Sequence, residues 1–450
     1  MRSQSATLAW VNTLPPEILS NILVRSGSYC TRDNVSRFCD PAAVCTYWRE
    51  VALGTVDLWT HIDLGPGTSY PLANLLLGRS KDSPIHVHLY EPKPPNYDRT
   101  PDYEVSKAVG VLAPLVHRVS TLDIKSLSYS RNLVSAILNL WLDSGSASLP
   151  RLLGVSRPSG HKILSPDGVS RNGKLRSRSE HAESVLKSLT VLHLHGVLFD
   201  WDSDAYRGLH DLRLDFSGYS SLVSTFKLAK VLSASPMLTV LKLKGLQMTV
   251  EEEIQPAPVF LGSLKVLSLQ SFHSTDGLRL FLPLITLPSS STELSIGIHG
   301  SDGIYEQLQN IFTRSSIATL FWKTVTWRFL SLLNSVTGLQ NLIIINLGVI
   351  DDIVTGYEDL LTSLSTPFSH PPRVILLLCP ITFKSLRHLV ARLGIRNLRL
   401  EQCFVADKIA DPSWSLEDVR AALLQIYPGL ECSISDTDST AELSCRTMFD

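Results

Sequence analysis

The chain has 450 residues, of which 44% are hydrophobic and 18% charged, and its formal net charge is −1. This length favours two or three domains, unless a repeat extends one of them, and the composition allows a large buried core. A nearly neutral chain has no overall field that would attract nucleic acid or anionic lipid, so neither is expected as a partner.

The sequence also argues against export and membrane insertion. Its start, MRSQSATLAWVN, lacks the long apolar core of a secretory signal. The apolar stretch VILLLCPITF is broken by Pro380 and is much shorter than the roughly 18 residues that span a bilayer. Seven cysteines, odd in number and widely spread, do not resemble a disulfide framework. We therefore expect a cytoplasmic or nuclear protein.

The first predicted helix begins in the stretch LPPEILSNIL, residues 14–23. Pro15 and Pro16 suit a first helical turn, where a missing N–H costs nothing, and Glu17 there favours the helix dipole. Apolar side chains recur four residues apart in two neighbouring rows, which are Leu14, Ile18 and Ile22, and Leu19 and Leu23. So short a helix is not stable alone, and we expect part of its packing surface to belong to another protein.

A second helix is predicted within DPAAVCTYWREVAL, residues 40–53. Asp40 is a good N-cap and Pro41 a good first helical residue. One face of this helix carries the apolar residues Val44, Trp48, Val51 and Ala52. The next stretch, LWTHIDL at 58–64, alternates and predicts a strand.

Together these three pieces resemble an F-box, and the chain is similar to fungal-type F-box proteins with a leucine-rich-repeat-like C-terminal domain. The resemblance implies docking on the Skp-type adaptor of a Skp–cullin–F-box ubiquitin ligase. It assigns the adaptor contact to Leu14, Pro15, Glu17, Ile18 and Ile22. It assigns the module core to Leu19, Val44, Trp48, Val51 and Trp59. The connection at 24–40 is longer than is usual in the family.

The remainder of the chain repeats a short pattern. LTVLHL, LHDLRL, LTVLKL and LKVLSL begin at residues 189, 209, 238 and 264, and weaker copies begin at 291, 317, 339 and 395. The central leucines are Leu192, Leu212, Leu241, Leu267, Leu294, Leu320, Leu342 and Leu398, with a further copy near Ile375. Their spacing resembles a leucine-rich repeat, whose units run about 20–29 residues with one strand each.

Helical patterns lie between these strands. SLVSTFKLAKVLSASP places Leu222, Phe226, Ala229 and Leu232 on one face, and DGIYEQLQNIFTR does so with Ile304, Leu308, Ile311 and Phe312. THIDL, IHVHL and STLDI, near residues 60, 85 and 120, predict earlier strands of the same kind. A last helix is expected in SLEDVRAALLQI, with Ser415 and Asp418 as a capping pair.

The predicted architecture is therefore α/β, a small N-terminal helical F-box followed by an irregular solenoid of strand–helix repeats. We expect a disordered N-terminus at 1–9, the F-box at 10–57, the solenoid at 58–430 and a tail at 431–450. Residues 156–183 are rich in Ser, Gly and charge, which predicts a flexible insertion on the solenoid rim.

No sequence motif for catalysis stands out. The chain has no Walker loop, no HExxH and no GxSxG. His86 and His88 form one i, i+2 pair, and a zinc set of Cys30, Cys39, Cys45 and His61 lacks standard ligand spacing. We expect neither a catalytic residue nor a metal or cofactor.

The residues between the repeat leucines predict a recognition surface. They should face the open side of the solenoid, where a mixed polar row suits a protein target. The candidates are His193, His195, Arg213, Asp215, Lys242, Lys244, Gln270 and Arg399. The alternative is that these side chains are simply solvated.

The resulting hypothesis is a non-catalytic substrate receptor of a ubiquitin ligase, which bridges the Skp-type adaptor, and through it a cullin, to an unknown protein target. The alternative is a repeat scaffold that acts without ubiquitination. A hydrolase or metal enzyme built on a solenoid is more distant.

Overall fold

The computed structural model describes most of the chain in separate segments. These are residues 14–26, 44–65, 69–91, 102–126, 132–144, 151–156, 162–164, 180–216, 223–250, 256–270, 275–288, 292–297, 304–323, 332–333, 335–345, 371–381, 383–405 and 415–435. The chain divides into two compact units, Met1–Thr190 and Val191–Asp450.

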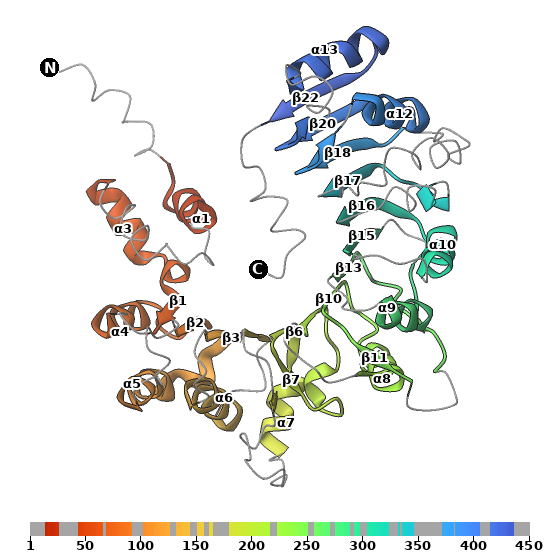
Figure 1. The fold of residues 1–450 in the computed structure, drawn as a ribbon. Coiled ribbons are helices and arrows are strands. Elements are labelled where there is room, and N and C mark those ends of the chain that lie inside the picture. The colour runs from red at the N-terminus through yellow and green to blue at the C-terminus, as the bar shows by residue number, and fades with distance from the viewer. Residues whose placement is uncertain are drawn as a thin grey trace, which may run out of the picture. The chain divides into compact units, whose positions relative to one another are not determined.

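The first unit begins with helices and continues as alternating strands and helices (Figure 1). The helical start comprises α1 (Pro16–Ser26), α3 (Thr46–Gly54) and the 3-10 helix η2 (Val56–Trp59). After it come β1 (His61–Leu64), α4 (Tyr70–Arg79), β2 (Ile85–Glu91), α5 (Asp102–Leu112), η3 (Ala113–Arg118), β3 (Val119–Ser126), α6 (Asn132–Ser144), β4 (Arg151–Ser156), β5 (Lys162–Leu164) and α7 (Glu180–Lys187).

Strands β1, β2, β3 and β4 pair in chain order, and every pair is parallel. Their apolar residues alternate toward one face, where Ile62, Val87 and Leu122 align across the strands and are at most 1% exposed. Parallel neighbours need a crossover between them, and α4, α5 and α6 with η3 supply it. The strands expected near residues 60, 85 and 120 are therefore confirmed.

The expected strand at 58–64 is shorter than predicted, because residues 56–59 form η2. Leu58 and Trp59 are consecutive and both buried, which an alternating strand with one solvent face would not allow. The backbone N–H of Leu58 instead donates to the carbonyl oxygen of Thr55 at 3.2 Å. The turn lets both side chains reach the interior.

The second unit carries a longer series of parallel strands. Its main strands are β6 (Leu189–His195, which begins in the first unit), β8 (Asp211–Asp215), β10 (Val240–Lys244), β13 (Val266–Gln270), β15 (Thr292–Gly297), β16 (Ile317–Lys323), β17 (Asn341–Ile345), β18 (Arg373–Leu377), β20 (Asn397–Glu401) and β22 (Glu431–Ser435). They pair in this order and all are parallel.

A leucine ladder runs through these strands in register. Leu192 aligns with Leu212, and the same position continues through Leu241, Leu267, Leu294, Leu320, Leu342, Val374, Leu398 and Cys432. The predicted repeat leucines thus occupy equivalent places. In β18 the ladder position is Val374, and Ile375 points to the other side of the sheet because side chains alternate along a strand.

Several strands end in a residue with positive φ. Gly196 (65°) follows β6, Gly245 (69°) follows β10, Leu378 (54°) follows β18 and Gln402 (50°) follows β20. This left-handed conformation turns the chain out of the strand direction. Short strands then follow, namely β7 (Val197–Phe199), β11 (Met248–Thr249), β19 (Pro380–Ile381) and β21 (Phe404–Val405).

The connections of the second unit contain helices and short pairings. They are η4 (Asp204–Tyr206), β9 (Val223–Ser224), α8 (Thr225–Ser233), β12 (Val259–Phe260), α9 (Thr275–Phe281), η5 (Leu282–Leu284), β14 (Ile285–Thr286), α10 (Tyr305–Arg314), α12 (Phe383–Leu393) and α13 (Leu416–Ile426). Helices α8, α9, α10 and α12 lie on one side of the strands (Figure 1).

The leucine ladder faces these helices. The rings of Phe312 on α10 and Trp322 on β16 meet edge to face at 6.0 Å. Trp322 shares its strand face with Leu320 because the two are two residues apart. We call this side the helix face, and the side that carries His193, Arg213 and Lys242 the opposite face.

The sequence predicted α10 and α13 correctly and α8 in part. Ile304, Leu308 and Phe312 are fully buried, as predicted for α10. At α13, the Ser415 hydroxyl accepts the N–H of Asp418 at 3.2 Å while Asp418 accepts the N–H of Ser415 at 2.7 Å, so the capping box is confirmed. On α8 Phe226 is 50% exposed, so its predicted place on the buried face is wrong.

The buried face of α8 is formed by Leu228, Ala229, Val231 and Leu232, rotated away from Phe226. Leu222, the other residue predicted there, lies outside the described residues. The predicted insertion at 156–183 also differs at its ends. Residues 162–164 form β5, and α7 begins at Glu180 with Ala182 buried. In the described part of the chain no helix combines the length and apolarity needed to cross a bilayer.

Candidate functional site

Helix α1 has two apolar rows of side chains, one buried and one exposed. Leu19 and Leu23, one turn apart, are 0% and 3% exposed, whereas Ile18 and Ile22 are 47% and 44% exposed. The helix begins after Pro15, whose carbonyl oxygen accepts the N–H groups of Ile18 and Leu19, both at 3.0 Å. One row therefore packs inside the unit, and the other leaves a pair of branched apolar side chains in solvent.

The inner row of α1 is held by α3 and η2. Thr55, between these two elements, donates its hydroxyl to Ser20 on α1 at 3.0 Å, and Tyr47 on α3 donates its hydroxyl to the carbonyl oxygen of Leu14. The indole N–H of Trp59 donates to the carbonyl oxygen of Ala52 at 3.0 Å. The first two contacts tie α1 and the residues before it to α3 and its C-terminal end, and the third ties η2 to α3.

The predicted adaptor-contact residues lie together at the start of α1. Pro15, Glu17, Ile18 and Ile22 are exposed and Leu14 is half-buried. The predicted core residues of the module differ in how deeply they are buried. Leu19 and Trp59 are buried, and Trp48 and Val51 are half-buried.

Val44 is 55% exposed, so its predicted place in the core is wrong. It precedes Cys45, the N-cap of α3, whose sulfur accepts the N–H of Trp48 at 3.4 Å. Val44 therefore lies before the helix and is not carried by its buried face. The predicted N-cap and first helical residue, Asp40 and Pro41, lie outside the described residues.

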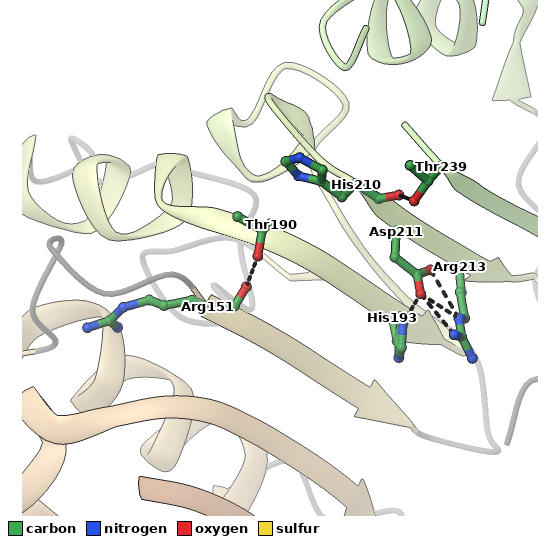
Figure 2. Close-up of polar contacts among 7 residues, drawn as sticks. All are labelled: Arg151, Thr190, His193, His210, Asp211, Arg213 and Thr239. Atoms are coloured by element: carbon green, nitrogen blue, oxygen red, sulfur yellow. Dashed lines mark hydrogen bonds and ion pairs between the residues drawn. The ribbon is translucent and has the colours of Figure 1, made fainter. Parts of the chain in front are cut away.

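On the opposite face of the second unit, charged side chains of β6 and β8 form a compact cluster (Figure 2). The Asp211 carboxylate accepts two hydrogen bonds from Arg213, with Nη2 at 2.8 Å and Nε at 3.0 Å. The Nε2 atom of His193 lies 3.4 Å from the same carboxylate. The guanidinium of Arg213 is thus already paired within the chain.

A second cluster repeats this arrangement one pair of residues further along the strands. Asp215 is fully buried, and its Oδ2 atom lies 2.9 Å from Nζ of Lys244 and 3.4 Å from Nε2 of His195. In β20, Arg399 makes an ion pair with the buried Glu401. Asp211, Asp215 and Glu401 thus each have a cation beside them, which offsets the desolvation of both partners.

The pKa values follow from these contacts. Burial alone would raise the pKa of Asp211, but hydrogen bonds from His193 and Arg213 hold it below its ordinary value. Burial lowers the pKa of His195, against the attraction of Asp215, and Lys244 lowers it further. The lowered pKa values favour the charged form of Asp211 and the neutral form of His195.

The predicted target-contact residues therefore divide into two groups. His193, His195, Arg213, Lys244 and Arg399 are half-buried and reach solvent. Asp215, Lys242 and Gln270 are at most 7% exposed, so the prediction that they form an accessible row is wrong. Adjacent strands about 4.8 Å apart cover the side chains at their centre.

A histidine cluster lies on β1 and β2 of the first unit. The ring of His61 stacks on His86 at 4.6 Å and lies 6.0 Å from His88, whose Nδ1 is 3.4 Å from Asp123. Burial, with the neighbouring His86 and His88, lowers the pKa of His61 to about 3. Among the described residues, no group of three or more His, Cys, Asp or Glu is placed to hold a metal ion. Cys30 and Cys39 lie outside those residues.

A cavity of about 350 Å³ opens on the helix side of the second unit, a feature the sequence did not reveal. Its walls come from the end of β11, from α9 through β14, and from α10, and they include Arg279, Gln307 and Arg314. Among its described lining residues there is no carboxylate, histidine or cysteine.

Comparison with known families matches residues 11–65 to the F-box-like family. The chain as a whole matches no curated protein. The matched segment contains α1, α3, η2 and β1, and with them all the predicted adaptor-contact residues. The N-terminal part of this protein is thus an F-box-like domain, joined to a large α/β region of parallel strands.

Proposed function

We propose that this protein is a non-catalytic substrate receptor of a Skp–cullin–F-box ubiquitin ligase. F-box domains commonly bind Skp-type adaptors, and the match at residues 11–65 supports this role. The observation that carries the proposal is the outer row of α1. Ile18 and Ile22 are nearly half exposed on a helix whose other row is buried, which is costly in water unless a partner covers them.

In this proposal the adaptor buries Ile18, Ile22, Leu14 and Pro15, and Glu17 lies at the rim of the contact. A branched side chain that enters a partner's pocket is a typical interface anchor. The parallel strands that follow form a repeat solenoid, whose opposite face receives the protein target. Its contribution to the reaction is proximity, because it holds target lysines near a ubiquitin-charged enzyme on the same scaffold.

The adaptor contact is tested with the double variant Ile18→Ala, Ile22→Ala in the full chain. Loss of two anchors should weaken binding to a purified Skp-type adaptor by about 2–4 kcal/mol, or roughly 30- to 1,000-fold. The matched control is Leu75→Ala on α4, which is 48% exposed and lies outside the matched segment. Binding measured by titration calorimetry should be unchanged for the control. Equal affinity of the double variant and the unaltered chain would rule out this docking mode.

The ligase role is separated from a scaffold role by a second measurement. Cells expressing the full chain or the double variant are treated with a proteasome inhibitor, and bound proteins are identified by mass spectrometry. A ligase receptor should recover cullin and ubiquitinated targets with the full chain only. Targets without cullin or ubiquitin on either chain would show a scaffold.

A further inference from the structure

Two ion pairs on the opposite face of the second unit hold the anion inside and the cation outside. The side chain of Asp215 is fully buried, whereas that of Lys244, with Nζ 2.9 Å from the carboxylate, is 31% exposed. In β20 the buried Glu401 pairs in the same way with Arg399, whose side chain is 30% exposed. A molecule that approaches this face from solvent therefore meets the cations of these pairs before their carboxylates.

The register of the strands accounts for the buried carboxylate. Asp215 on β8 aligns with His195 on β6 and with Lys244 on β10, so it has a longer side chain on each side. A short aspartate stays low between such neighbours, while a lysine carries its charge outward on a long apolar stem. Two residues earlier on β8, Arg213 points to the same face because side chains alternate along a strand.

Arg213 supplies a second cation close to Lys244. It donates to Asp211 through Nε at 3.0 Å and Nη2 at 2.8 Å, and its Nη1 atom takes no part in that pair (Figure 2). Arg213 and Lys244 are one strand and two residues apart, which is a diagonal of roughly 8 Å. We call Arg213 and Lys244 the cation patch.

The charge balance of the three strands has the same sign. In β6, β8 and β10 three cations (Arg213, Lys242 and Lys244) stand against two carboxylates (Asp211 and Asp215), a net charge of +1 with the histidines neutral. The next strand, β13, adds no charge. A basic partner would be repelled by the accessible cations and could not reach Asp215. An anionic partner is complementary to this part of the face.

We propose that the opposite face recognises an acidic segment of the protein target through the cation patch. This inference rests on the proposed function, which makes the face the target surface. Carboxylates or phosphorylated side chains of the segment accept hydrogen bonds from Nη1 of Arg213 and from Nζ of Lys244. In an extended peptide, side chains two residues apart lie on one side at roughly 7 Å, which matches the diagonal of the patch.

A nucleic acid fits this surface less well than an acidic peptide. Binding to a phosphate backbone draws its affinity from many cations along the strand, whereas the cation patch has two. The chain as a whole has a net charge of −1, so it adds no attraction for a polyanion over longer distances.

The class of partner is tested by titrating the full chain into fluorescent peptides at physiological ionic strength. An oligoglutamate peptide or a phosphoserine peptide should bind about tenfold more tightly than an oligolysine peptide, and the tighter of the two acidic peptides identifies the anion. An RNA oligonucleotide is titrated alongside. Equal binding of acidic and basic peptides, or tighter binding of the RNA than of both acidic peptides, would overturn the proposal.

A matched pair of double variants tests the site with the net charge of the chain unchanged. Asp215→Asn with Lys244→Gln removes an accessible cation together with its buried partner, and should weaken binding of the acidic peptide by about tenfold. Asp202→Asn with Lys230→Gln removes an exposed ion pair that includes α8. This control should change the affinity by less than about twofold. Equal losses in the two variants would place recognition elsewhere.

Lysine acetylation of the unaltered chain tests the same contact independently of any effect of the substitutions on folding. Saturating acidic peptide should lower the acetylation of Lys244 by about fivefold, since a bound carboxylate covers the amine, and should leave Lys230 unchanged; peptide mapping measures both. Absence of protection at Lys244 would contradict the placement. Adaptor affinity of the same protein is measured in parallel. Intact adaptor binding without acidic-peptide binding would overturn this inference alone, and the reverse result would overturn the proposed docking alone.

Discussion

Leu378 holds a backbone conformation that suits glycine. Its φ is 54°, the strand β18 ends just before it, and its side chain is 45% exposed. A residue with a Cβ in this region costs about 1 kcal/mol. At the equivalent places after β6 and β10 the chain has Gly196 and Gly245. The positive φ thus belongs to the position directly after the strand, and whichever residue stands there adopts it.

We therefore expect Leu378→Gly to raise the free energy of unfolding by about 0.5–1 kcal/mol. Leu378→Ala is the matched control, because it removes the same exposed side chain and keeps the Cβ. It should give no gain. Denaturant unfolding followed by circular dichroism measures both, and a stability of Leu378→Gly at or below that of Leu378→Ala would contradict this account.

The buried carboxylate of Asp215 offers a second residue-scale comparison. Asp215→Asn leaves Lys244 and His195 without their anion inside the protein, at a cost of about 2–3 kcal/mol. Asp202, whose ion pair with Lys230 at 2.6 Å is solvent-exposed, is the control. Asp202→Asn should change stability by no more than about 0.5 kcal/mol. Similar losses for the two variants would show that burial does not govern these pairs.

Helix α13 begins with a complete capping box, in which Ser415 and Asp418 satisfy each other's backbone N–H. Ser415→Ala should lower the free energy of unfolding by about 1 kcal/mol, because the N–H of Asp418 loses its acceptor. Ser415→Asp restores a capping oxygen and should recover most of the loss. The result that would count against the cap is equal destabilisation by both.

The sequence predicted elements where their pattern was periodic. The repeat leucines and the capped α13 were identifiable because register and capping depend on local residue types. The turn at Val56–Trp59 was missed because the alternating pattern of residues 58–64 predicted a strand throughout. Leu58 and Trp59 are both buried, which a turn allows and an alternating strand does not. Val44 was misplaced because α3 begins only after its N-cap Cys45, so Val44 precedes the helix.

The candidate sites were predictable in part. The exposed row of α1 follows from helical spacing, but its accessibility depends on where α3 packs. The opposite face was expected to be polar throughout. LFW, LIII and VILLL in β16, β17 and β18 are continuous apolar runs, a signal of strands covered on both faces. Along these strands the polar side chains of the opposite face give way to Phe321, Ile343 and Ile375, which pack together.

The stability of the whole molecule should depend on pH through its buried histidines. Burial lowers the pKa of His61 to about 3, and lowers the pKa of His86 and of His195. Unfolded histidines take up protons below about pH 6.5, while the folded protein resists this uptake. Stability is therefore full above pH 6.5 and falls as the pH drops from there toward 3.

His61→Asn should flatten this decline, because one of the resisting groups is gone. Thermal unfolding midpoints at pH 7.5, 6.5 and 5.5 measure the slope. His181→Asn on the exposed side of α7 is the control and should follow the unaltered chain. A slope that stays the same in His61→Asn would mean that other groups govern the acid sensitivity.

The leucine ladder keeps its register although the connections between its strands differ in length. From Leu192 to Leu212 the interval is 20 residues, and from Leu212 to Leu241 it is 29. Pairing is thus set by each strand against its neighbour, whatever the length of the chain between them. A gene duplication that inserts one whole strand–helix unit would present the same leucine positions to both flanking strands. Unequal recombination could therefore lengthen or shorten the series of strands, and so change the extent of the opposite face, without redesigning the interior.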